Sequence, residues 1–155
     1  MAARPGTPTG EAPAREARMA GDARRIAEEQ AALRRVAVLV ARAAPPEEVF
    51  AAVAAEAGRL LHASHAAVSR YDPDGATSIV GTWSGTGVTR VPIGTRVSPG
   101  DRTVTALVTR TGRPARLDDY GVATGTAAEI AREYGFRSAV ACRSASRAGC
   151  GASSA

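Results

Sequence analysis

Hydrophobic positions along residues 15–43 recur at alternating spacings of four and three residues. This spacing is typical of the seam of a heptad repeat, so it predicts one long helix. The seam consists of Met19, Ala23, Ile26, Gln30, Leu33, Ala37 and Val40. Two interpretations stay open, a parallel coiled-coil dimer in which Gln30 sets the register, or an amphipathic helix that packs on its own domain.

A second helix is predicted over residues 45–62. Pro45 and Pro46 end the first helix, and the acidic pair that follows them suits a helical first turn. An apolar face with a period of 3.6 residues runs along this helix. It comprises Val49, Phe50, Val53, Ala57, Leu60 and Leu61.

After this helix, the hydrophobic pattern changes to a period of two residues. Residues 66–71 and 77–83 each predict a strand, and Asp72-Pro-Asp-Gly75 between them is a strong turn sequence. The two strands form a predicted hairpin, and a further short strand is expected near residues 92–97.

The remaining pattern predicts a helix over 103–109, an extended piece at 115–117, a helix over 126–134 and a buried strand at 136–141. Gly135 suits the residue that ends the second of these helices. Hairpins mixed with helices indicate an α+β domain with an antiparallel sheet flanked by helices. Residues 1–14 lack periodicity and are expected to be disordered.

The composition of the chain limits the classes of function that it can have. The length of 155 residues fits one domain. All 20 basic residues are Arg and Ala occurs 35 times, which is typical of a GC-rich genome. The net charge of +5 is therefore weak evidence for nucleic-acid binding, and base-stacking aromatics make up only 4%. No stretch is apolar enough to span a membrane and no export signal is present, so we expect a cytoplasmic protein.

Candidate chemistry is sparse. Cys142 and Cys150 are the only cysteines, and they lack the spacing of a metal site. His62 and His65 lie near the end of the second helix without the further ligands that a metal needs. We therefore expect no metal site and no catalytic activity.

In the order of its segments, the chain resembles a GAF domain, specifically that of bacterial sensor histidine kinases from GC-rich, actinobacterial-type organisms. The residues that carry the resemblance are PPEEVFAAVAAEAGRLL (45–61), VSRYDPDGATSIVGTW (68–83), VPIGTRV (91–97), TGRPARLDDY (111–120) and AAEIAREYGFRSAVA (127–141). It implies a non-catalytic regulatory module over residues 44–141 that binds a small molecule between its sheet and lid segments. The helix 15–43 would then signal to an output domain such as a kinase. Cyclic nucleotides, tetrapyrroles and small acids are all ligands of the family, and no residue selects among them.

The resemblance suggests a ligand pocket, and its candidate lining is Trp83, Arg96, Asp119, Tyr120 and Tyr134. Asp118, Asp119 and Tyr120 form a compact polar cluster, with Arg96 or Arg116 as a charge partner. The alternatives are that the acids lie in a solvated turn and that Trp83 anchors the core.

The tail, residues 142–155, departs from the family. Relatives continue with a closing hairpin, whereas CRSASRAGCGASSA has no hydrophobic alternation. If the tail is written in suitable GC-rich codons and read in another frame, it becomes Pro-Ile-Ser-Val-Glu-Gly-Arg-Leu-Trp-Gly-Val-Ile, which fits the missing hairpin. We therefore expect a frameshifted, truncated domain that lacks its closing strands, leaves a sheet edge open and ends in a non-native, disordered tail.

Two other functions remain open. One is a redox enzyme that uses Cys142 and Cys150, like the GAF-type methionine sulfoxide reductases. The other is an interaction protein that dimerises through a coiled coil over residues 15–43, with Met19, Ile26, Leu33 and Val40 in the interface.

Overall fold

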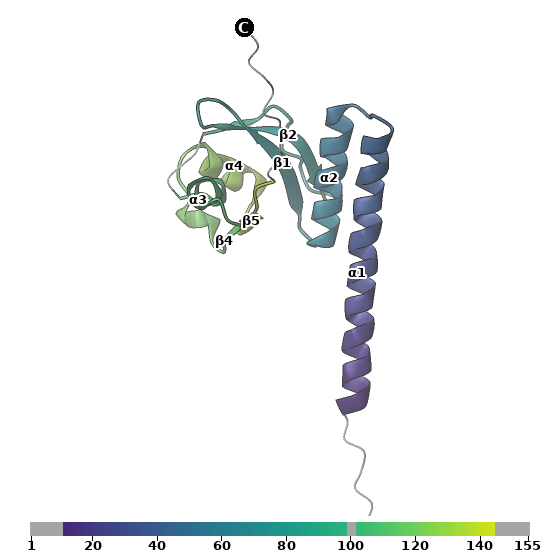
Figure 1. Cartoon of the computed structure of the whole chain (residues 1–155). Helices are drawn as coiled ribbons and strands as arrows, with labels where there is room; N and C mark the ends of the chain where they lie inside the picture. The colour runs from purple at the N-terminus through teal and green to yellow at the C-terminus, as the bar shows by residue number, and fades with distance from the viewer. Residues whose placement is uncertain (1–10, 99–101, 145–155) are drawn as a thin grey trace, which may run out of the picture.

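A computed structural model describes residues 11–98 and 102–144. Its helices are α1 (Glu11–Ala41), α2 (Pro46–Leu60), α3 (Val104–Thr111) and α4 (Thr126–Tyr134), with a short 3-10 helix η1 (Tyr120–Val122). Its strands are β1 (His65–Tyr71), β2 (Thr77–Ser84), β3 (Arg96–Val97), β4 (Ala115–Leu117) and β5 (Ala139–Ala141). Figure 1 shows α1 and α2 on one side of the strands and α3 and α4 on the other. The α+β class is confirmed.

The predicted hairpin forms as β1 and β2, which pair antiparallel from His65 opposite Ser84 to Tyr71 opposite Thr77. The register shifts by one residue after Val68, so that β2 carries a bulge. At the turn, the Asp72 carbonyl accepts a hydrogen bond from Gly75, which has a φ of 84°. Glycine adopts this left-handed conformation without strain.

The strands form two sheets, where the sequence predicted one. One sheet has the order β1-β2-β3 and the other contains β4 and β5. The expected strand at 92–97 shrinks to β3, since Pro92 has no N–H to donate and Gly94 turns the chain at a φ of 86°. β5 is likewise shorter than expected, and it is not the buried strand that was predicted, since Val140 is 59% exposed.

α1 begins at Glu11, earlier than the sequence predicted, so residues 11–14 are helical and not disordered. Pro13 is compatible with this start because a first helical turn needs no N–H donor there. Residues 1–10 and 145–155, where disorder was expected at each end, lie outside the described residues. Within the described ranges, no helix is long and apolar enough to cross a membrane.

α2 is packed between β2 and α1, and the prediction of its buried face is confirmed only in part. Four of the six predicted residues are half-buried, namely Val49, Phe50, Ala57 and Leu60. Val53 and Leu61 are exposed, whereas the buried residues are Ala54, Glu56 and Gly58. A helix covered on two sides needs small residues so that both neighbours can approach closely. The apolar periodicity in the sequence reflects the positions of the large side chains and not those of the small ones.

A separate cluster holds α3, η1 and α4 against β4 and β5. Val104, Tyr120 and Ala131 are buried at its centre, and Leu117 and Phe136 pack around them. The Thr103 hydroxyl caps α3 by accepting a hydrogen bond from the Ala106 amide at 3.0 Å.

Candidate functional site

Two glycines mark a close approach between β2 and α2. A Cβ on Gly81 would lie 2.6 Å from the backbone carbon and oxygen of Phe50. A Cβ on Gly58 would lie 2.1 Å from Cε3 of Trp83. Both distances are far below ordinary contact, so only glycine allows the strand and the helix to approach this closely.

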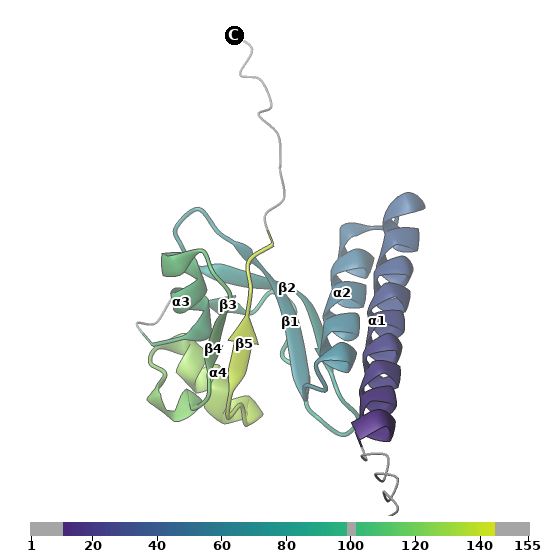
Figure 2. The same ribbon diagram turned by 60° about the horizontal axis from the view of Figure 1, so that its bottom comes forward.

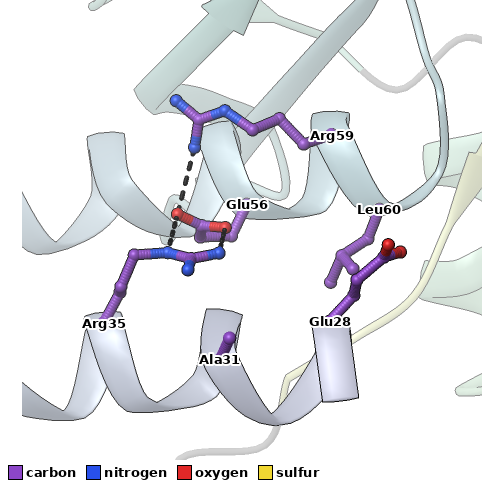
Figure 3. Close-up of a pocket in the computed structure, with 6 residues that line it drawn as sticks. All are labelled: Glu28, Ala31, Arg35, Glu56, Arg59 and Leu60. Atoms are coloured by element: carbon purple, nitrogen blue, oxygen red, sulfur yellow. Dashed lines mark hydrogen bonds and ion pairs between the residues drawn. The ribbon is translucent and has the colours of Figure 1, made fainter. Parts of the chain in front are cut away.

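On its other side, α2 is tied to α1 through a buried carboxylate. The Glu56 side chain is only 11% exposed. Arg35 donates two hydrogen bonds to it, from Nε to Oε1 at 2.8 Å and from Nη2 to Oε2 at 2.7 Å. Arg59 donates a third, from Nη1 to Oε1 at 3.0 Å. Figure 3 shows the carboxylate held between the two guanidinium groups, one from each helix.

The hydrogen bonds from Arg35 lower the pKa of Glu56, and this effect exceeds the opposing effect of burial. In return, the hydrogen bond with Glu56 raises the pKa of Arg35. Both groups therefore stay charged around neutral pH. A carboxylate whose two oxygens already accept three hydrogen bonds is poorly placed to act as a general base, so the cluster is built for attachment.

The same cluster lines an open groove between α1 and α2. One part, with a volume of about 200 Å³, is bounded by Glu28, Ala31, Arg35, Glu56, Arg59 and Leu60. A wider part of about 530 Å³ is lined by Arg34, Arg35, Val38, Leu39, Ala52, Ala55, Glu56 and Arg59. The lining combines aliphatic side chains with guanidinium groups and with the carboxylates of Glu28 and Glu56.

We expect replacement of Glu56 by glutamine to lower the thermal unfolding midpoint at pH 7 by a few degrees. Because the folded-state pKa of Glu56 is lowered, its ion pairs contribute fully above the ordinary value of 4.5. That contribution is lost as the pH falls through the lowered pKa. The gap between the natural chain and E56Q should therefore close on acidification.

The matched control for this prediction is Glu47→Gln, in the exposed first turn of the same helix. Midpoints measured by circular dichroism from pH 7 down to about pH 2 span the acid range in which carboxylates titrate. A gap between the natural chain and E56Q that stays constant over this range would contradict the assignment.

The structure does not bring the sequence-predicted pocket residues together. Trp83 lies in β2 with its ring against Gly58 of α2. Arg96 lies in β3 and pairs with Asp72, at 2.9 Å, and with Asp74. Both acids belong to the β1–β2 turn, so Arg96 fastens this turn and is not the partner of the Asp118–Tyr120 cluster.

The other predicted pocket residues lie around η1 and α4. Asp119 caps η1 by accepting a hydrogen bond from the Gly121 amide at 2.8 Å. Tyr120 is buried, and this burial raises its pKa. Tyr134 is half-buried at the end of α4, its ring centroid 6.2 Å from that of Phe136. Asp118 pairs with Arg116, one of the two partners expected for it.

The structure describes both histidines and one of the two cysteines. His65 opens β1, where its Nε2 lies 3.0 Å from the Thr89 carbonyl oxygen. His62 has a φ of 49° just after α2. Cys142 is exposed and not in a disulfide, and Cys150 lies outside the described residues. Across residues 11–98 and 102–144, no group of three or more His, Cys, Asp or Glu side chains could hold a metal ion.

The sequence did not reveal the Arg35–Glu56–Arg59 cluster. Arg35 is one of many arginines, and Glu56 lies 21 residues away on another helix. The one available signal was a single acidic residue within the alanine-rich stretch AAVAAEAG.

These features define an α+β domain in which helices cover antiparallel strands on both sides. The model of the GAF domain family matches residues 45–143, well over half of the chain. The chain therefore belongs to the GAF domain family, a family of ligand-sensing regulatory domains. No curated protein matches it.

Solved structures support the fold. The crystal structure of the phycocyanobilin-bound GAF domain from a cyanobacterial phytochrome is 16% identical, with a TM-score of 0.53. The match covers 72% of this chain and 69% of that one. The phycoerythrobilin-bound GAF domain from a cyanobacterial phytochrome is 15% identical with the same TM-score, covering 72% and 70%. At these identities the likeness establishes the fold.

Proposed function

We propose that this chain is the small-molecule-sensing module of a cytoplasmic, two-component sensor histidine kinase, without catalytic activity of its own. The observation that carries the proposal is membership of the GAF family over residues 45–143. The order of sequence segments that resembles GC-rich, actinobacterial-type sensor kinases supports the kinase context. Nucleic acid is not its ligand in this proposal, because the excess positive charge is distributed among acids and aromatics are scarce.

The packing described above supports a route for the signal. Gly81 and Phe50 join the sheet to α2, and the Glu56–Arg35 ion pair joins α2 to α1. A ligand that moves β2 would therefore displace α2 and, through it, α1. In this proposal α1 carries the signal to the output domain.

A ligand screen tests the sensing role. We expect phycocyanobilin, a cyclic nucleotide (cyclic AMP or cyclic GMP) or a small organic acid to raise the unfolding midpoint of the full chain, because binding to the folded state alone stabilises it. Isothermal titration would then give the affinity. If no compound of the three classes shifts the midpoint, the small-molecule proposal fails.

The competing redox function makes an opposite prediction about the cysteines. A C142S/C150S double variant would lose all activity if they were catalytic. In our proposal, this variant keeps the ligand-induced shift of the natural chain unchanged.

We further propose that the partner of α1 is a second copy of this chain. From Ala12 to Ala31 every residue of α1 is exposed. Most of the stability of a helix in a protein comes from packing of an apolar face, and a partner chain would supply this packing here. Its apolar d positions are Met19 (62% exposed), Ile26 (53%), Leu33 (64%) and Val40 (60%).

The heptad geometry supports a parallel pair. α1 faces α2 with other residues, chiefly the buried Ala32 together with Val36 and Leu39, so the seam stays available. In a parallel coiled coil, Glu29 at a g position meets Arg34 at the e position of the partner, which is an attractive pair. No ion pair of Arg34 is found within the described structure.

A further inference from the structure

The groove between α1 and α2 carries an excess of positive charge in its wider part. Arg34, Arg35 and Arg59 line this part together with a single carboxylate, that of Glu56, which leaves an excess of two positive charges. In the narrower part, Glu28 is added and Arg34 is absent, so that two arginines and two glutamates balance (Figure 3). The wider part therefore attracts an anion and repels a cation.

The arginines keep unused hydrogen-bond donors after they have bound Glu56. Within the described residues, Arg59 donates to Glu56 from Nη1 alone, and Arg34 forms no ion pair. The side chains of Arg35 and Arg59 are both 57% exposed, so a ligand can reach them. Guanidinium groups bind carboxylates through paired hydrogen bonds, as Arg35 does with Glu56. The groove can therefore hold a second carboxylate beside that of Glu56.

Next to these arginines, the groove is apolar. Arg35 of α1 pairs with Glu56 of α2. Further along α1, Arg42 pairs with Glu48 near the start of α2, so the two helices are antiparallel. The lining between the two pairs is aliphatic and comprises Val38, Leu39, Ala52 and Ala55. Since Arg42 follows Arg35 by seven residues, the apolar stretch is about 10 Å long, the length of an extended chain of about eight carbons.

We propose that the wider part of the groove is a binding site for a free medium-chain fatty carboxylate. The carboxylate accepts hydrogen bonds from Arg59, and the charge of Arg34 adds to the attraction. The aliphatic chain lies along Val38, which is 56% exposed and therefore offers apolar surface. This site lies on the helices and not on the sheet, so the inference is separate from the small-molecule pocket proposed above and holds whether or not that pocket binds a ligand.

The test titrates the full chain with sodium octanoate below its micelle concentration and follows the backbone amides by NMR. The amide signals around Leu39 and Ala52 should shift. Hexanoate and butanoate should bind more weakly, by about two- to fourfold for each methylene group removed, since each one leaves apolar surface. Octanol lacks the charge and should bind at least about tenfold more weakly than octanoate. Equal binding of octanol and octanoate, or no shift at these amides, would overturn the proposal.

Val38→Glu tests the position of the ligand, because it places a carboxylate on the apolar stretch. It should weaken octanoate binding by at least about tenfold, since the new charge repels the ligand and the apolar contact is lost. Val53→Glu is the matched control, because Val53 is also exposed on α2 but does not line the groove. It should bind octanoate as the natural chain does. If V53E loses binding as strongly as V38E, the groove is not the site and the proposal is wrong.

The same variant separates this site from two other destinations of an anionic amphiphile. Octanoate is a small organic acid, so it could also enter the pocket of the sensing module. Binding that V38E retains in full would belong to that pocket, which would overturn this inference and leave the proposed function intact. Vesicles of phosphatidylglycerol test a membrane as the source of the anion. If they bind the natural chain but not V38E, while octanoate does not bind, the proposal of a free fatty carboxylate is wrong.

Discussion

Replacing Gly81 with alanine should strongly destabilise the domain and lower its unfolding midpoint. The added Cβ would lie 2.6 Å from the Phe50 carbonyl carbon and oxygen, and these are backbone atoms that no side-chain rotation can remove. β2 and α2 would have to separate along their whole contact. Overpacking commonly costs about 1–3 kcal/mol, and a clash between two backbones lies at or above the upper end of that range. Domains hold only about 5–15 kcal/mol in total.

Gly85→Ala is the matched control, since Gly85 follows the same strand. Its Cβ would meet nothing closer than the Ser64 carbonyl oxygen at 3.8 Å, which is ordinary contact. Thermal unfolding by circular dichroism, together with resistance to a protease, should separate the two variants clearly. Equal midpoints for G81A and G85A would show that β2 and α2 do not pack as described.

The local elements of this fold were predictable from the sequence because their signals are local. The Asp72–Gly75 turn and its two flanking strands follow from alternation and turn chemistry, and the hairpin is confirmed. α4 ends where expected, at Gly135, whose φ of 71° suits glycine. The extended piece at 115–117 is confirmed as β4.

Contacts between distant segments were not predictable in the same way. Arg96 and Asp72 are separated by 24 residues, and nothing in either segment marks the pair. The fully buried positions of α2 were missed because they are one alanine, one glycine and one glutamate. Small residues carry little hydrophobic signal, although they permit the closest packing.

In α1, the helix itself was predictable from the sequence, whereas its contact with another helix was not. Its heptad spacing predicted a long helix, which is confirmed, while the surface that contacts α2 centres on Ala32, outside the seam. A periodic stripe shows that a face is apolar without showing which partner covers it. The pairing of the seam is therefore a matter for experiment.

Substituting glutamate at Ile26 and Leu33 together should convert a dimer of the chain into a monomer. Each side chain is more than half exposed within one chain, so the domain itself should stay folded. Burial of such a side chain contributes about 1.5–3 kcal/mol, and the double variant removes it from both copies. The dimer dissociation constant should rise by more than about a thousandfold, measured by sedimentation equilibrium.

Val38→Glu is the matched control, because Val38 is 56% exposed on α1 but lies off the seam. It should sediment as the natural chain does. A natural chain that is monomeric at every concentration, or a V38E variant that dissociates equally, would contradict a dimer through the seam.

The orientation of the dimer follows from its charges. In a parallel pair, Glu29→Arg places two arginines opposite each other and weakens the dimer, since like charges repel across e and g positions. Adding Arg34→Glu to the same chain restores the attraction with reversed sign, so E29R/R34E should dimerise like the natural chain. In an antiparallel pair, g positions face g positions and e positions face e positions. The double exchange would then not restore dimerisation, because each g position would still face a g position and each e position an e position. This result would exclude the parallel arrangement.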